Sequence, residues 1–333
     1  MILVDAVYVH HSGVRILLDE LIRALEAKST EVHYLLDRRN QGDYDHLGGD
    51  RVRYIPGSAI ARVRFYRENQ HLYRRVICFS SVPPPIRLDG ECILYLQSTL
   101  MFTMDGVTRS TFLKRLAHNV YMRLTRRFVD RWIVQTDHMR LRSRRFLGQR
   151  AVDVIPFFPE SKSVDRIQDD RFHFLYASDG YPHKNHLRLI DAFEYAAQAR
   201  PDVTLHVTIS DAFPDLKSVV SELQRKGVPI LDHGFVPHSE VVRLYSKTHA
   251  QIYPSLTEAL GIGLIESAQM ELPVIAADLP YVHELIVTPY RFDPMDIRMM
   301  ADAMINVRDE KRPESAELRI QNRLAELTEL LLG

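Results

Sequence analysis

The sequence has 333 residues, which is enough for two domains of ordinary size. Lys and Arg together number 43, as do Asp and Glu, so the chain has no net charge that would draw it to nucleic acid. Hydrophobic residues make up 46% of the chain, but no run approaches the roughly 20 apolar residues of a membrane-spanning helix, so a globular protein is expected.

Seven segments of the first half predict β-strands, because short apolar runs alternate there with turn-forming residues. They are residues 2–9, 31–36, 51–55, 75–79, 92–96, 131–135 and 152–156. Amphipathic helices are predicted between several of them. The clearest is at 14–27, where one stripe contains Leu17, Leu18, Leu21, Ile22 and Leu25.

The segment from Arg109 to Arg150 is strongly basic, with twelve Lys or Arg residues against two Asp. Within it, apolar residues recur at helical spacing at Leu113, Leu116, Val120, Leu124 and Phe128. Two interpretations stay open. The helix packs its apolar stripe on the core and leaves a solvated basic face, or the segment rests on the headgroups of an anionic membrane surface.

The second half repeats the alternation, with strands predicted at 172–177, 203–209, 228–233, 250–254 and 272–277 and helices near 185–199, 214–226, 238–248 and 262–271. Apolar strands joined by helices indicate parallel sheets covered on both faces. The polar stretch 161–170 is interpreted as an interdomain linker. We therefore predict an α/β protein with two doubly wound, Rossmann-like domains, at 1–158 and 159–310, and a cleft between them. The end of the chain, 311–333, is predicted to contain a helix with Leu318, Ile320 and Leu324 that crosses back to the first domain.

The stretch EALGIGLIE at 258–266 follows a strand and enters a helix, so it lies at the carboxyl edge of the second sheet, where ligands bind. Its turn amides and the positive end of the helix, at Gly261, Ile262 and Gly263, favour a phosphate. Side chains are absent at the two glycines, which leaves room for that phosphate. Glu258 and Glu266, on either side, can each accept hydrogen bonds from vicinal hydroxyls. The arrangement suits a nucleotide diphosphate sugar.

The same stretch, continued to residue 286, resembles the signature of retaining glycosyltransferases of family 4 (group 1), which have the GT-B fold. The resemblance covers the second half of the chain and, more weakly, the first. It implies that Glu258 contacts the donor sugar and Glu266 holds the nucleotide ribose.

The loop YASDGYPHKNH at 176–186 resembles the family's diphosphate-binding loop, which implies a catalytic role for Lys184 in binding phosphate. Relatives carry a partner Arg where this chain has Ser178 or Asp179. Without it, Lys184, backbone amides and the neighbouring His183 would hold the charge. The alternative is an exposed lysine in a first helical turn. His183 and His186 are interpreted as packing or surface residues.

Three further segments carry weaker resemblance. The resemblance of GFVPHSEVVRLY at 234–245 implies that the backbone of Phe235 and Val236 lies beside the nucleobase. HHSG at 10–13 implies that Ser12 and Gly13 lie against the diphosphate and that His10 or His11 lines the acceptor side, with a packed loop as the alternative for the histidines. Gln97 falls where relatives place a histidine near the reacting sugar, and an amide cannot shuttle a proton.

A metal site is considered only at Asp43-Tyr44-Asp45, an Asp-x-Asp of the kind that GT-A glycosyltransferases use. The loop is rich in turn formers and the two-domain pattern contradicts GT-A, so no metal and no cofactor are expected. Cys78 and Cys92 have no motif spacing, and the N-terminus lacks the features of a signal peptide. A cytoplasmic location is expected, with peripheral attachment to the inner face of the membrane.

The expected function is metal-independent, retaining hexosyl transfer from a nucleotide diphosphate sugar to a hydroxyl of a growing glycan. The expected context is a lipid-linked bacterial surface polysaccharide of the O-antigen, lipopolysaccharide or capsule type. Two alternatives remain: an inactive GT-B scaffold or regulatory subunit, and a soluble glycosyltransferase that acts on protein or a metabolite. Nucleic acid is not an expected partner.

Overall fold

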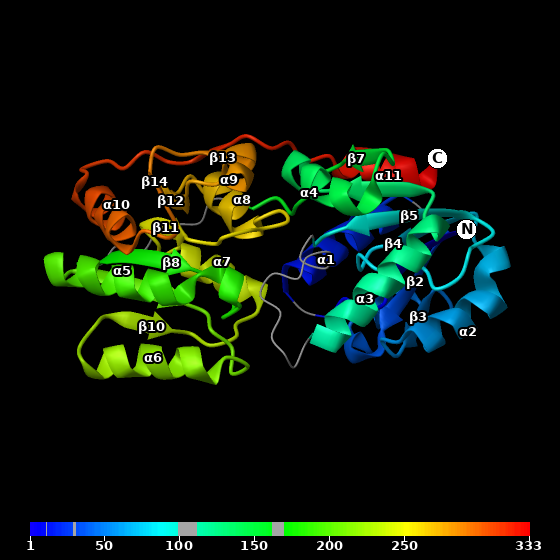
Figure 1. Ribbon diagram of the computed structural model, residues 1–333, viewed down its shortest axis with the longest axis horizontal. Helices are drawn as coiled ribbons and strands as arrows, with labels where there is room; N and C mark the ends of the chain where they lie inside the picture. Colours follow the sequence, from blue (N-terminus) through cyan, green and yellow to red (C-terminus); the bar gives the residue numbers. More distant parts are fainter. Residues whose placement is uncertain (11, 29–30, 99–111, 162–169) are drawn as a thin grey trace. The chain divides into compact units, whose positions relative to one another are not determined.

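The computed structural model describes residues 1–10, 12–28, 31–98, 112–161 and 170–333, which form two compact α/β units (Figure 1). Unit 1 comprises Met1–Pro159 and Gln321–Gly333, and unit 2 comprises Glu160–Ile320. Most of the predicted linker, residues 162–169, lies outside the described residues. No helix of the described residues is long and apolar enough to cross a membrane.

Unit 1 is built on a seven-stranded sheet in the order β3-β2-β1-β4-β5-β6-β7, in which every pair is parallel. The strands are β1 Ile2–Ala6, β2 Val32–Asp37, β3 Val52–Ile55, β4 Arg75–Cys78, β5 Glu91–Leu96, β6 Arg131–Val134 and β7 Val152–Val154. Each falls within or beside a predicted segment. The longer helices are α1 Ser12–Glu26, α2 Ala59–Asn69, α3 Phe112–Thr125, α4 Asp137–Leu147 and α11 Leu324–Leu332.

Unit 2 contains a six-stranded parallel sheet in the order β10-β9-β8-β11-β12-β14. Its strands are β8 Phe172–Tyr176, β9 Val203–Val207, β10 Ile230–Asp232, β11 Ala250–Tyr253, β12 Val274–Ala277 and β14 Arg291–Phe292. Its helices are α5 His186–Ala199, α6 Pro214–Arg225, α7 His238–Tyr245, α8 Ile262–Gln269, α9 Pro280–Leu285 and α10 Ile297–Asp309. The strand order reverses between β8 and β11, and such a switch point is where open α/β sheets bind ligands.

The stripe predicted on the first helix is confirmed, because all five of its apolar side chains are buried in α1. The stripe on α3 differs. Leu113, Leu116, Val120 and Leu124 are between 46% and 74% exposed, whereas Met122 is buried. The interpretation that this stripe packs on the core is therefore wrong. An amphipathic pattern predicts a helix but does not say which environment its apolar face meets.

The end of the chain also differs from the predicted helix. Glu317–Leu318 forms β15, which pairs with β13 (Ile286–Val287) in an antiparallel ladder. Ile320 N–H then donates to Leu285 O at 3.3 Å, so unit 2 runs to this point. The helix begins only at Leu324. It packs on α1 of unit 1 with Leu327 and Leu331 fully buried.

Candidate functional site

Hydrogen bonds connect the loops that follow β8 and β11 at the switch point of unit 2. Leu256 N–H donates to His183 O at 2.8 Å, and Asn185 Nδ2–H donates to Pro254 O at 3.2 Å and to Pro294 O at 2.8 Å. Asn185 has φ +62°, a left-handed conformation that asparagine tolerates better than most residues. The residue after Lys184 thus anchors the loop, which fixes the lysine beside the second loop.

Lys184 and Glu258 form an ion pair within this junction. Lys184 Nζ lies 2.7 Å from Glu258 Oε1, with the side chains 19% and 11% exposed. Tyr253 O–H donates to the same oxygen at 3.2 Å. Burial, followed by the Glu258 charge, raises the pKa of Tyr253, so its hydroxyl stays a donor. The fold therefore brings together the two residues expected to be catalytic, which are 74 positions apart.

Helix α8 begins beside this pair. Leu264 and Ile265 donate their N–H groups to Gly261 O at 2.9 and 3.4 Å, so the first-turn amides of Ile262 and Gly263 have no acceptor within the helix. Gly261 has φ +67°, which favours glycine here independently of any ligand. The amides and the positive end of the helix form the anion-binding feature that the sequence predicted.

Gly263 has a different role from the one assigned by sequence. A Cβ atom at this position would lie 3.1 Å from Gln251 Nε2 and 3.2 Å from Tyr253 Cε2. The missing side chain makes room for strand β11, so close packing of α8 on the sheet is by itself a reason for a glycine at this position. A ligand contact through its N–H stays a prediction.

Glu266 lies on α8 and is buried, with its side chain 4% exposed. Oε1 lies 2.5 Å from His238 Nε2, and Oε2 accepts from Tyr245 O–H at 3.2 Å. The hydrogen bond to Glu266 raises the pKa of His238. Sequence reasoning missed both partners, although His238 and Tyr245 are seven residues apart in a predicted helix and so share one face.

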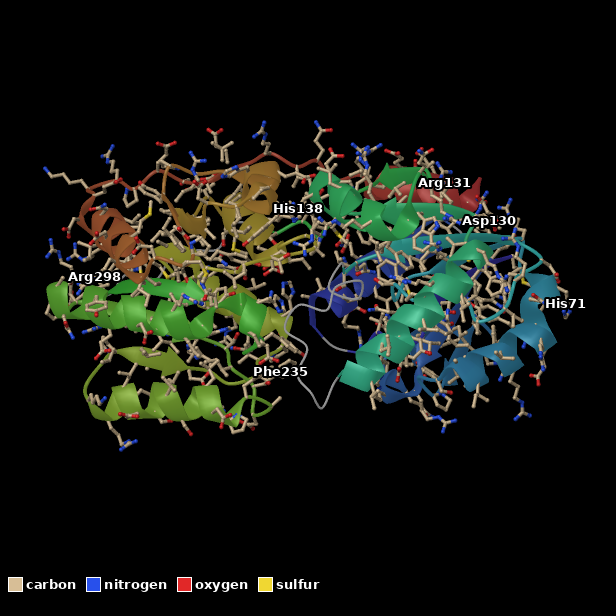
Figure 2. The ribbon with its side chains drawn as sticks, viewed as in Figure 1. His71, Asp130, Arg131, His138, Phe235 and Arg298 are labelled. Carbon is tan, nitrogen blue, oxygen red and sulfur yellow. The ribbon has the colours of Figure 1, made fainter. Side chains whose placement is uncertain are left out.

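The loop between β10 and α7 carries the two predicted nucleobase contacts. Phe235 is 69% exposed, and Figure 2 labels its side chain, while Val236 is half-buried. Gly234, at φ +67°, makes the turn, and its N–H donates to Asp232 Oδ1 at 3.0 Å. This places an exposed aromatic ring and backbone at the carboxyl end of β10. Contact with a base stays a prediction.

In unit 1, Gln97 follows β5 and is buried. Its Nε2 donates to Phe79 O at 2.6 Å and its backbone N–H to Ser81 Oγ at 2.7 Å. Continuing the β5–β6 register sets Gln97 level with Gln135, a residue that sequence reasoning did not single out. Among the described residues, Gln97 Oε1 and Gln135 Nε2 are buried and have no hydrogen-bond partner. One acceptor and one donor atom are thus unsatisfied at this edge.

The structure describes only some of the other residues predicted to line the site in unit 1. Gly13 is the second residue of α1, which begins at Ser12. His11 lies outside the described residues. His10 Nδ1 lies 3.1 Å from Tyr8 O, and its Nε2 lies 2.8 Å from an Arg39 guanidinium nitrogen.

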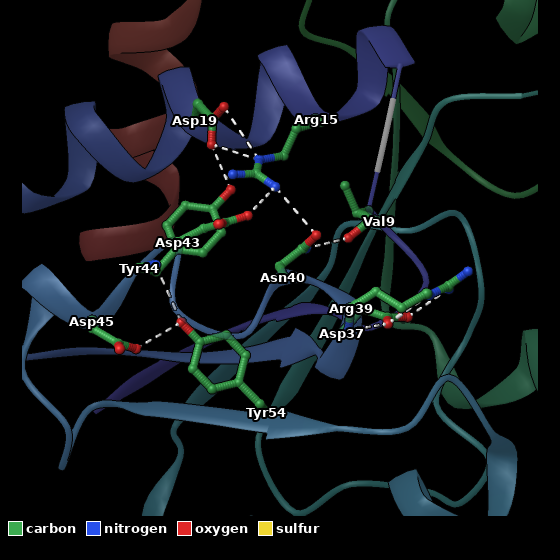
Figure 3. A network of polar contacts seen from close by, with 10 residues as sticks. All are labelled: Val9, Arg15, Asp19, Asp37, Arg39, Asn40, Asp43, Tyr44, Asp45 and Tyr54. Carbon is green, nitrogen blue, oxygen red and sulfur yellow. Dashed lines mark hydrogen bonds and ion pairs between the residues drawn. The ribbon is translucent and has the colours of Figure 1, made fainter. Parts of the chain in front are cut away.

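The acids of the Asp-x-Asp motif form protein contacts, as Figure 3 shows. Asp43 Oδ2 lies 3.0 Å from an Arg15 guanidinium nitrogen, and Tyr54 O–H donates to Asp45 Oδ1 at 3.3 Å. The network braces the loop against α1. No cluster of three or more His, Cys, Asp or Glu able to hold a metal occurs within the described part of the chain.

Comparison with known proteins agrees with this architecture. Residues 157–323, half of the chain, match the model of the family described as glycosyl transferases group 1. Over 139 residues the chain is 30% identical to the O-antigen chain mannosyltransferase RfbU of Salmonella typhimurium (strain LT2). That match covers 40% of this chain and only 38% of the relative.

Two solved structures have the same fold. WaaG, a glycosyltransferase involved in lipopolysaccharide biosynthesis, has a TM-score of 0.69 and 14% identity, with both chains fully covered. Anabaena Alr3699/HepE, solved in complex with UDP and glucose, has a TM-score of 0.70 and 13% identity over 99% of this chain and 95% of that chain. The chain has the GT-B fold and belongs to the glycosyl transferases group 1 family.

Proposed function

We propose that the protein is a retaining, metal-independent glycosyltransferase that uses a nucleotide diphosphate sugar as its donor. The observation that carries the proposal is the junction of Lys184, Glu258 and the start of α8 at the switch point of unit 2. A cation and a positive helix end favour a diphosphate, while carboxylates suit the hydroxyls on either side of it. The complex of HepE with UDP and glucose supports this assignment.

In the proposed reaction the acceptor hydroxyl attacks the anomeric carbon on the face that the diphosphate leaves. The hydroxyl proton passes to the departing phosphate oxygen, the new glycosidic bond forms and the nucleoside diphosphate is released. Lys184 and the α8 amides stabilise charge that grows on the leaving group, and Glu258 orients the sugar hydroxyls. The arrangement needs no protein base, in keeping with an amide at Gln97.

A binding screen tests this donor assignment. UDP, GDP, ADP and dTDP are added singly to the protein, and the one that binds the native state raises its melting temperature. Lys184→Ala should weaken binding of that diphosphate about tenfold or more, with a smaller effect on the matching nucleoside. Lys226→Ala is the matched control, because Lys226 is an exposed lysine of the same unit paired with Glu222. Equal weakening of nucleoside and diphosphate would remove Lys184 from the phosphate site.

We further propose that the acceptor is a lipid-linked glycan and that α3 holds the protein on the anionic cytoplasmic face of the membrane. The four exposed apolar residues of α3 form a stripe, and two exposed cations accompany it, Arg123 in the last turn of α3 and Arg127 just after the helix. Such a surface inserts apolar side chains between headgroups while its cations bind lipid phosphates. The O-antigen mannosyltransferase among the relatives supports this context.

Vesicle sedimentation tests the membrane proposal. Wild-type protein should bind vesicles of phosphatidylcholine mixed with phosphatidylglycerol at low salt, and pure phosphatidylcholine much less. Leu116→Ser with Val120→Ser, or Arg123→Gln with Arg127→Gln, should reduce binding while nucleotide affinity stays unchanged. Arg126 is unsuitable, because it donates to Phe146 O and lies 5.5 Å from that ring centre. Ile60→Ser on α2 is the control, since Ile60 is 84% exposed and apolar. Wild-type protein that stays in the supernatant would favour a soluble acceptor.

An inactive GT-B subunit is the second candidate. Relatives carry an Arg where this chain has Ser178 or Asp179, and Asp179 Oδ1 accepts from Gly180 N–H at 3.0 Å and Ser210 N–H at 3.1 Å, so an acid stabilises this loop. A subunit of this kind would bind nucleoside diphosphate without cleaving any diphosphate sugar. Slow hydrolysis of the donor by wild-type protein, lost in Glu258→Gln, would exclude it.

A further inference from the structure

His238 is held against the most deeply buried carboxylate of the candidate site. Glu266 needs hydrogen-bond partners, because burying a charged group without them is costly. His238 supplies one at 2.5 Å, and Tyr245, from the same helix α7, supplies the other at 3.2 Å. Each carboxylate oxygen keeps a further lone pair, so both can still accept a ribose hydroxyl.

The imidazole of His238 is positioned to exchange a proton with solvent. Its side chain is 33% exposed, whereas that of Glu266 is 4% exposed. Glu266, on α8, is the charged group that acts on His238. The other charges of α7, Glu240 and Arg243, pair with each other at 3.0 Å on its exposed side. The proton on His238 therefore decides the net charge of the His238–Glu266 pair, which is neutral with it and negative without it.

We infer that His238 is a positioning residue that orients Glu266 for the donor ribose and, through its proton, sets how strongly the site binds the diphosphate. The inference rests on the proposed function. A neutral pair adds no charge to the site, where Lys184 is paired with Glu258 and the positive start of α8 favours the diphosphate. A negative pair at the ribose hydroxyls opposes the anionic diphosphate further along the donor, over a distance at which such charges still interact. Binding of an uncharged nucleoside depends on the orientation of Glu266 toward the ribose but not on the charge of the His238–Glu266 pair.

Isothermal titration from about pH 5.5 to pH 9, across the range of a histidine with a raised pKa, tests both effects. The probes are the nucleoside diphosphate selected by the screen and its nucleoside. As pH rises, wild-type affinity for the diphosphate should fall about two- to fivefold more than affinity for the nucleoside. His238→Gln keeps a non-titrating N–H near the position of Nε2, so it should retain binding within about twofold and lose this extra pH step. His238→Leu should weaken both probes about tenfold.

Two comparisons make the result specific. The diphosphate itself gains or loses a proton in the same pH range, and this changes its affinity for wild type and for His238→Gln alike. The role of His238 is therefore measured by the difference between the pH profiles of the two proteins. Arg243→Gln changes the charge of α7 without touching Glu266 and should keep the wild-type profile. A His238→Gln profile identical to wild type would overturn the inference, as would unchanged affinities in a folded His238→Leu. Wild-type protein that binds none of the diphosphates would overturn the proposed function itself, and the inference with it.

Discussion

At the scale of single residues, Glu258 is paired with Lys184 before any donor arrives. Glu258→Gln removes the carboxylate charge but leaves the lysine free to bind phosphate. We expect turnover to fall about ten- to a hundredfold, because a charged hydrogen bond to the reacting sugar is worth about 1.5–3 kcal/mol. Affinity for the bare nucleoside diphosphate should not fall, because removal of the Glu258 charge leaves Lys184 to the phosphate. Initial rates and nucleotide titrations on one preparation measure the two quantities.

Glu266→Gln is the companion variant and should weaken nucleotide and sugar nucleotide alike, because the ribose belongs to both. If Glu258→Gln loses nucleotide binding while Glu266→Gln binds nucleotide like wild type, the two roles are reversed. If both variants keep wild-type nucleotide affinity and wild-type turnover, the donor binds elsewhere.

His186 gives unit 2 a pH-dependent stability. It is buried at the start of α5, its Nε2 donates to Ser178 O at 3.1 Å, and burial lowers its pKa to about 4. The unfolded chain, with a histidine pKa of about 6.5, binds the proton more readily than the native state. Stability is therefore fully present above about pH 6.5 and should fall by up to about 3 kcal/mol as pH drops to about 4.

Urea unfolding across this pH range checks the effect. His186→Gln can keep the bond to Ser178 and should flatten the acid limb of the profile, whereas His46→Gln, at an exposed histidine, should not. A His186→Gln profile as steep as that of wild type would assign the acid sensitivity to other groups.

At the scale of elements, the contact between α8 and β11 depends on Gly263. Gly263→Ala would place a methyl group a few tenths of an ångström too close to Gln251 and Tyr253 and should destabilise unit 2 by about 1–3 kcal/mol. Chemical denaturation gives the value, and Gly49→Ala, where no atom lies within 4 Å, is the control. A neutral Gly263→Ala would show that α8 can shift without cost.

Elements also show the limit of pattern reasoning. Alternation of apolar runs and amphipathic segments predicted strands β1 to β12, because those periods follow from backbone geometry. It gave no segment for helices α2, α4, α9 and α10 or for strands β13 to β15. The predicted helix at the C-terminus was wrong before Leu324, since Leu318 lies in β15 and Ile320 follows that strand with its N–H bonded to Leu285 O. A two-residue strand gives no periodic signal of its own.

At the scale of the whole molecule, the chain ends by returning to unit 1. Arg323 N–H donates to Pro156 O at 2.8 Å, and Lys28 Nζ–H donates to Thr328 Oγ1 at 2.8 Å. Truncation after Ile320 exposes the surface that Leu327 and Leu331 cover, so unit 1 should lose about 3–6 kcal/mol while unit 2 is little affected. Calorimetry separates the two, because nucleoside diphosphate should raise chiefly the melting temperature of unit 2. Equal destabilisation of both transitions would contradict this assignment.

By itself, the sequence determined two parallel α/β units and the family resemblance, and it predicted Lys184, Glu258 and Glu266 as site residues, because local periodicity and short motifs are encoded in neighbouring positions. Only the tertiary structure decided which residues meet. The β8–β11 neighbourhood pairs Lys184 with Glu258, and the packing of α7 on α8 brings His238 and Tyr245 to Glu266. The outward face of α3 was likewise decided by packing. Contacts between distant segments depend on strand order and helix orientation, which no local pattern specifies.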